Sequence, residues 1–76
     1  MKASVKKQIR AVLEVLVMQV NALDTLLETE QDFLDLNQEE MTEERVENLT
    51  AEIDLLEEAR QLCESAGDTL TYLLGE

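Results

Sequence analysis

Apolar side chains recur along the whole chain at alternating intervals of four and three residues. In the first half these seam positions are Ile9, Leu13, Leu16, Val20, Leu23, Leu27 and Leu34, with Glu30 as the one polar member. In the second half they are Val46, Leu49, Ile53, Leu56, Arg60, Cys63, Gly67, Leu70 and Leu74. This is the heptad spacing of α-helices that pack along a seam, whereas a half-buried strand would alternate with a period of two. The sequence therefore predicts an all-α fold.

The pattern predicts two helices of nearly equal length. The expected elements of this single domain (1–76) are a helix over about 4–36, a turn over about 37–41 and a helix over about 42–74. Ser4 is a candidate N-cap for the first helix, and both Asn37, with Glu40 three residues later, and Thr42 are candidates for the second. A short connection between helices of this length indicates an antiparallel, coiled-coil-like hairpin.

Besides the small Cys63, three seam positions lack a large apolar side chain. Gly67 either ends the second helix as a C-cap or lies inside it. A continuous helix is preferred because the apolar register runs on to Leu70 and Leu74. A glycine there would allow close approach of the helices, at a propensity cost of about 1 kcal/mol relative to Ala. Glu30 and Arg60 are expected to fix register or oligomeric state, and not to pair with each other.

Several features of common catalytic sites are missing from the sequence. The chain has no histidine, so a His-based triad or a His-containing zinc site cannot be built. There is also no Gly-rich phosphate loop or nucleophile elbow. The acidic run from Glu28 to Asp35 lacks the glycine of a calcium loop. We therefore expect no enzymatic activity, no cofactor and no metal.

The single cysteine, Cys63, excludes an intrachain disulfide. We expect Cys63 to be a small buried side chain, with an interchain disulfide or a reactive thiol as the alternatives.

The first ten residues carry a cluster that we call the basic N-terminus: Lys2, Lys6, Lys7 and Arg10. It superficially resembles the start of a signal peptide, but Glu14 interrupts the apolar stretch that follows, and a cytoplasmic location is expected. The cluster could contact an anionic membrane surface. In a hairpin it would instead lie beside Asp68, Glu76 and the terminal carboxylate.

Charge is distributed very unevenly. The formal net charge is −12, and residues 11–76 hold all 18 acidic side chains against two basic ones, a local net of −16. The residues proposed to form a partner-binding acidic face are Glu40, Glu43, Glu44, Glu47, Asp54, Glu57 and Glu58. Such a face either only keeps the chain soluble or attracts a basic protein. It disfavours direct nucleic-acid binding, although it could imitate nucleic acid toward a protein that binds it.

The first helix carries more apolar surface than one seam can bury. The candidate self-association residues are Val5, Val12, Val15, Val17, Met18, Leu26 and Phe33. Residues 15–18 are consecutive apolar side chains and cover most of the helix circumference. We expect a homodimer that forms a four-helix bundle, with a patch for a different protein as the alternative.

Two segments carry a family resemblance: the stretch from Leu27 to Asn37, with its acidic-Gln-x-aromatic helix end, and the Leu/Ile/Ala repeat from Ile53 to Ala59. Together they resemble small acidic helical-hairpin proteins of phages and prophages of Gram-positive bacteria, mostly of unassigned function. This chain departs from that pattern in having no proline in the turn and a more apolar first helix. The resemblance implies a phage accessory protein that binds and blocks a host protein, and it assigns no site residues.

Together these features predict a non-enzymatic, acidic protein-binding module, an inhibitor or adaptor that meets a basic surface of a host protein. The first alternative is a structural or scaffolding coiled-coil subunit. The second is a peripheral membrane-surface binder that uses the basic N-terminus, although we expect no membrane association.

Overall fold

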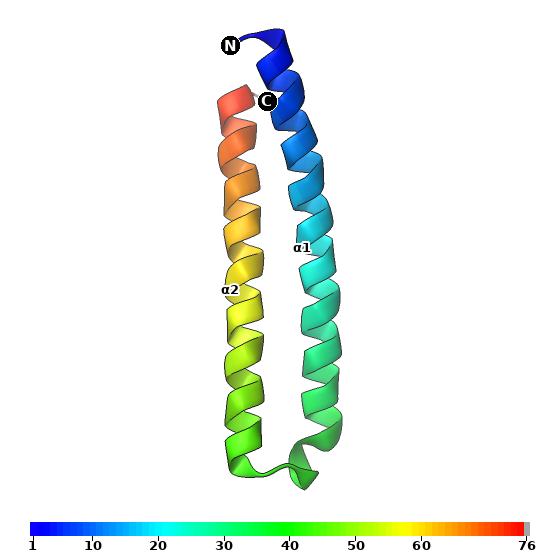
Figure 1. Ribbon diagram of the computed structural model, residues 1–76. Helices are drawn as coiled ribbons and strands as arrows, with labels where there is room; N and C mark the ends of the chain where they lie inside the picture. The colour runs from blue at the N-terminus through cyan, green and yellow to red at the C-terminus, as the bar shows by residue number, and fades with distance from the viewer. Residues whose placement is uncertain (76) are drawn as a thin grey trace.

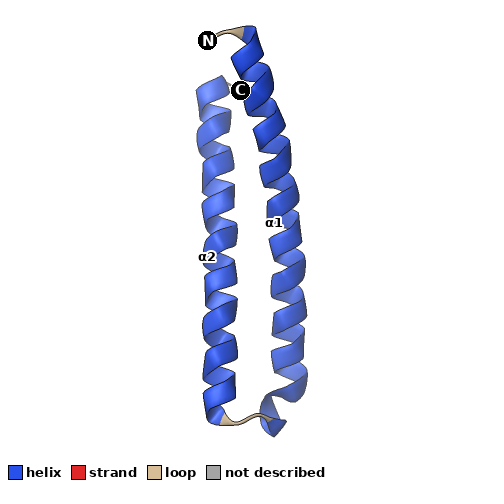
Figure 2. Cartoon of the chain, viewed as in Figure 1, coloured by secondary structure: helices blue, strands red, loops and turns tan. Residues whose placement is uncertain are grey.

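The computed structural model describes residues 1–75 and shows an antiparallel hairpin of two long helices (Figure 1). Helix α1 spans Ala3–Asn37 and α2 spans Glu43–Leu74, with a short 3₁₀ turn, η1, over Gln38–Glu40. The described residues form no strand (Figure 2). The predicted all-α hairpin is therefore confirmed, and each helix begins and ends within one residue of the expected bounds. The hairpin is a rod measuring 57 × 15 × 14 Å.

The seam forms a thin core between α1 and α2. Every seam position is buried or half-buried. Leu34, Leu49 and Ile53 form a buried cluster near the turn, and Met41 packs against it. Among the described residues at the open end of the rod, only Leu74 is buried, with 6% of its surface exposed. Two paired helices cannot enclose a side chain from all directions, so most seam residues keep contact with water.

Thr42, one of the two candidate caps, opens α2. Its Oγ1 accepts a hydrogen bond from the backbone N–H of Arg45 at 3.2 Å. Glu43 lies in the first turn of α2, where the helix dipole favours a carboxylate. Asn37, the other candidate, instead ends α1, and its Nδ2 donates to the carbonyl oxygen of Phe33 at 2.8 Å.

The predicted N-cap at Ser4 is wrong. Helix α1 begins at Ala3, with Lys2 in the N-cap position and no side-chain cap. The carbonyl oxygen of Lys2 accepts hydrogen bonds from the N–H groups of Val5 and Lys6, each at 3.1 Å. The first turn therefore closes before Ser4 can cap it, and Ser4 lies inside the helix.

Helix α2 runs through Gly67 without a break, as the seam register predicted, and ends at Leu74, with Gly75 as its C-cap. Gly75 has φ 76°, in the left-handed region that favours glycine, and its N–H donates to the carbonyl oxygen of Tyr72 at 3.0 Å. A Cβ at Gly67 would lie 3.9 Å from Cδ2 of Leu13, an ordinary van der Waals distance. An alanine side chain would therefore fit at Gly67 at the observed separation of the helices.

Candidate functional site

The seam divides the surface of the rod into two long flanks that differ in chemistry. On one flank, α1 contributes Val5, Val12, Leu26 and Phe33, which are spaced by multiples of seven residues and so share one helix face. Val15 precedes Leu26 by eleven residues, about three turns, and lies on the same face. These five side chains are between 40% and 54% exposed.

Helix α2 adds apolar side chains to the same flank. Leu26 and Leu55 line one hollow together with Glu52, and Glu52 also lines a second hollow with Phe33 and Arg45. Leu55 therefore lies on the side of the seam that carries the α1 stripe. Helical periodicity from Leu55 places the other members of α2 there. We define the apolar flank as Val5, Val12, Val15, Leu26 and Phe33 of α1 with Leu55, Ala59, Leu62, Ala66 and Leu73 of α2.

The α2 half of the apolar flank was missed at the sequence level, although a simple signal marks it. Every residue of the flank directly precedes a seam position or its heptad equivalent. Leu26, for example, precedes Leu27, and Leu62 precedes Cys63. Leu62 is 64% exposed. Two apolar residues in a row, the second of them in the seam, therefore predict an exposed apolar side chain on this flank.

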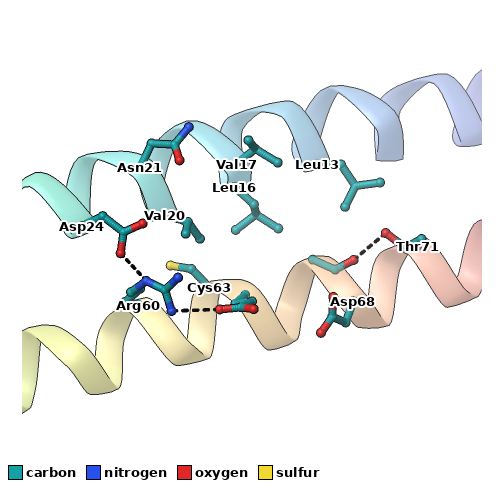
Figure 3. A pocket seen from close by; sticks show the side chains of 12 residues that line it. Leu13, Leu16, Val17, Val20, Asn21, Asp24, Arg60, Cys63, Asp68 and Thr71 are labelled. Atoms are coloured by element: carbon teal, nitrogen blue, oxygen red, sulfur yellow. Dashed lines mark hydrogen bonds and ion pairs between the residues drawn. The ribbon is translucent and has the colours of Figure 1, made fainter.

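Two of the seven candidate self-association residues lie elsewhere. Val17 lines a groove on the opposite flank, where Asn21 and Asp24 also lie (Figure 3). Met18, one residue further, is rotated by about 100° from Val17 and faces outward. It is 68% exposed. The structure thus brings five of the seven residues together and separates Val17 and Met18 from them.

Polar interactions bridge the two helices on the flank that carries Val17, which we call the charged flank. Arg60 Nε donates a hydrogen bond to Asp24 Oδ1 across the seam, and Arg60 Nη1 donates to Glu64 Oε2 at 2.9 Å (Figure 3). The hydrogen bond to Asp24 raises the pKa of the Arg60 guanidinium above its ordinary value. Side chains on a helix lean toward its N-terminus, so Arg60 reaches toward the turn and meets Asp24 rather than Glu30.

Cys63 lies in the groove of the charged flank, half-buried next to apolar seam residues of α1 (Figure 3). The groove is open along the rod, and its polar rim includes Asp68 and Thr71. The Thr71 hydroxyl donates to the Gly67 carbonyl oxygen at 2.9 Å. These contacts position side chains along α2.

The acidic face forms the outward side of α2. Glu43, Glu47, Asp54 and Glu58 follow one another at intervals of four, seven and four residues, so they lie along one line of the helix. Glu44 and Glu57 flank this line, and Glu40 lies in η1 just before α2. All seven side chains are exposed. The acidic face is therefore continuous along half of α2 and separate from the apolar flank.

The basic N-terminus and the end of α2 lie at the same end of the rod (Figure 1). Lys6 is half-buried. Two acidic residues were expected beside the basic N-terminus. Asp68 lines the groove of the charged flank, and Glu76 lies outside the described residues.

Within residues 1–75, no three Cys, Asp or Glu side chains come together as a metal-binding group. In the same part of the chain, neither α1 nor α2 combines the length and the apolar character that crossing a bilayer requires. Comparisons with protein-family models, with curated proteins and with solved structures gave no significant match.

Proposed function

We propose that this chain is a non-enzymatic protein-binding module whose acidic face binds a basic surface of another protein. The observation that carries the proposal is the line of exposed carboxylates along α2. The acidic face lies along one outward side of α2, and all seven of its carboxylates are exposed. A single-sign surface of this kind attracts an oppositely charged protein and orients it during encounter.

The acidic face has a cost that a bound partner would remove. Glu43 and Glu47 are four residues apart, as are Asp54 and Glu58. Like charges at this spacing destabilise a helix by about 0.2–0.5 kcal/mol per pair. Basic side chains of a partner would offset this repulsion, so its relief would add to the attraction that holds the complex together.

The resemblance to acidic hairpin proteins of phages supports a more specific form of this proposal. The module would be a phage-encoded inhibitor or adaptor that acts in the host cytoplasm. If its partner binds nucleic acid, the acidic face would occupy the groove that receives phosphates.

Capture from a bacterial lysate with the immobilised chain tests the proposal. We expect one stoichiometric basic protein to be retained at low salt and released as salt is raised. The variant Glu47→Gln/Asp54→Asn/Glu58→Gln should lose most of this protein. Glu14→Gln/Glu28→Gln/Asp32→Asn removes the same number of charges from exposed positions of α1 and is the matched control.

Equal binding by both variants, or equal loss in both, would show that the acidic face is not the binding site. Capture that is indifferent to salt would contradict an electrostatic contact.

A second candidate function is that of a structural assembly subunit. The apolar flank favours it, because exposed apolar side chains on both helices line up along one side of the rod. Retention of no other protein, together with stable self-association, would support this function instead.

A further inference from the structure

The chain exposes more surface than its size requires. A compact monomer of this mass is expected to expose about 4,700 Å². The hairpin exposes 5932 Å², about 1,200 Å² more. A standard protein interface covers about 800 Å² on each partner. The excess is therefore large enough to be buried in one ordinary interface.

The apolar flank is the part of that surface suited to burial. Leu26 on α1, with Leu55 and Leu62 on α2, are each at least half exposed. Leu26 and Leu55 line one hollow between the helices together with Glu30 and Glu52, so the two halves of the flank meet there. A flat side of a rod 57 Å long and about 15 Å wide has an area close to that of a standard interface.

The order of residues along this flank is self-complementary. The α1 stripe has Gln19 at its centre, with Val12 and Leu26 seven residues away on either side and Val5 and Phe33 fourteen residues away. If a second copy packs against it in the reverse direction, each small side chain meets a large one. Val5 faces the partner's Phe33, and Val12 faces the partner's Leu26.

The centre of the flank obeys the same symmetry. Gln19 meets Gln19 of the partner subunit on the two-fold axis, where the two amides can hydrogen-bond to each other. A single polar pair in an apolar interface selects one register. On α2, Leu55 and Leu62 lie on either side of the middle of the helix, so both fall in the central part of the interface.

Charge favours the same direction. The open end of the rod carries the basic N-terminus, whereas Glu39, Glu40 and Glu43 lie at the turn. Antiparallel packing brings the basic end of each copy to the acidic turn of the other, and parallel packing would bring like charges together.

We propose that the apolar flank binds a second copy of this chain, with the two rods antiparallel, to form a two-fold symmetric four-helix bundle. The inference does not depend on the acidic face, which points away from this interface. Its test uses the isolated chain, so it can fail while capture by the acidic face succeeds, and the reverse.

Mass and cross-linking test the proposal. At tens of micromolar, light scattering should give twice the 8.6 kDa of the chain. Leu62→Glu should give the monomer mass, whereas Met18→Glu, at an equally exposed position off the flank, should remain dimeric. Circular dichroism should show that both variants stay helical.

Direction is read from cysteine pairs in a Cys63→Ala chain. Val5→Cys mixed with Phe33→Cys should form a mixed disulfide dimer, and Gln19→Cys should form one with itself. A monomer mass for the unmodified chain, or dissociation by Met18→Glu alone, would overturn the proposal. Disulfide formation between Val5→Cys and Leu73→Cys chains, in place of the Val5–Phe33 pair, would also overturn it, because that pairing requires parallel rods.

Discussion

The two flanks of the hairpin are built from the same two helices and the same heptads, yet they end in opposite chemistry. On the charged flank, Arg60 crosses the seam to Asp24 and also bonds Glu64. On the apolar flank, Leu26 and Leu55 lie side by side and half exposed. Polar side chains therefore bridge the two helices on one flank, whereas the other flank leaves apolar side chains of both helices in contact with water, and we propose that a second copy covers them.

The largest expected effect comes from adding charge to the apolar flank. Leu55→Glu/Leu62→Glu should lower the free energy of unfolding by about 3 kcal/mol at tens of micromolar, because each leucine contributes about 1.5 kcal/mol or more when buried. Thermal melts should also lose their dependence on protein concentration. Met18→Glu is the control. If the unmodified chain melts at the same temperature over a hundredfold range of concentration, no second copy covers the apolar flank.

The next effect concerns a seam position beside the charged flank. Gly67→Ala should raise the free energy of unfolding by about 1 kcal/mol, because alanine is the better helix former and its methyl group meets Leu13 at an ordinary distance. Urea denaturation measures this change. A decrease would mean that the helices need the close approach that the 3.9 Å distance argues against.

A smaller effect is expected at the acidic face. Glu47→Gln/Asp54→Asn/Glu58→Gln should raise thermal stability at low salt by a few tenths of a kcal/mol for each like-charge pair removed. The gain should vanish in high salt because salt screens the repulsion. A gain that persists in molar salt would point to helix propensity rather than charge.

The smallest effect is expected at the ion pair of the charged flank. Asp24 and Arg60 are both partly exposed, and exposed pairs contribute little to stability. Asp24→Asn should therefore change the melting temperature less than Gly67→Ala does. A decrease in melting temperature as large as that of Leu55→Glu/Leu62→Glu would show that the Asp24–Arg60 pair contributes strongly to stability.

Much of this fold follows from the sequence because the heptad signal is long and uninterrupted. All seam positions and the continuity of α2 through Gly67 follow from periodicity alone. The N-cap of α1 was not predicted correctly, because backbone hydrogen bonds to the carbonyl oxygen of Lys2 close the first turn without a side-chain cap at Ser4. A cap is predicted from a single residue, and the backbone can satisfy the same N–H groups in another way. A seam is predicted from seventeen positions, so one exception does not change the result.

The candidate surfaces were predicted less completely. The residues of the acidic face repeat with helical spacing, so the sequence alone predicts that they form one surface. The grouping of Val17 with Leu26 fails because nine residues along a helix rotate a side chain by about 180°, to the opposite flank. Leu55 and Leu62 each directly precede a seam position, as Leu26 does, so the sequence contains their signal. That both helices place this position on the same flank follows from their antiparallel pairing.

The most direct test of the apolar flank is a distance between the turns of two copies. A spin label at Gln38→Cys in a Cys63→Ala chain marks the turn end of the rod, and pulsed electron resonance measures the distance between labels in a dimer. Antiparallel rods place the two labels at opposite ends, about 50 Å apart, since α2 alone is about 48 Å long. A separation below about 30 Å, or no dipolar coupling at all, would contradict the account, because parallel rods bring the turns together and a monomer has no second label.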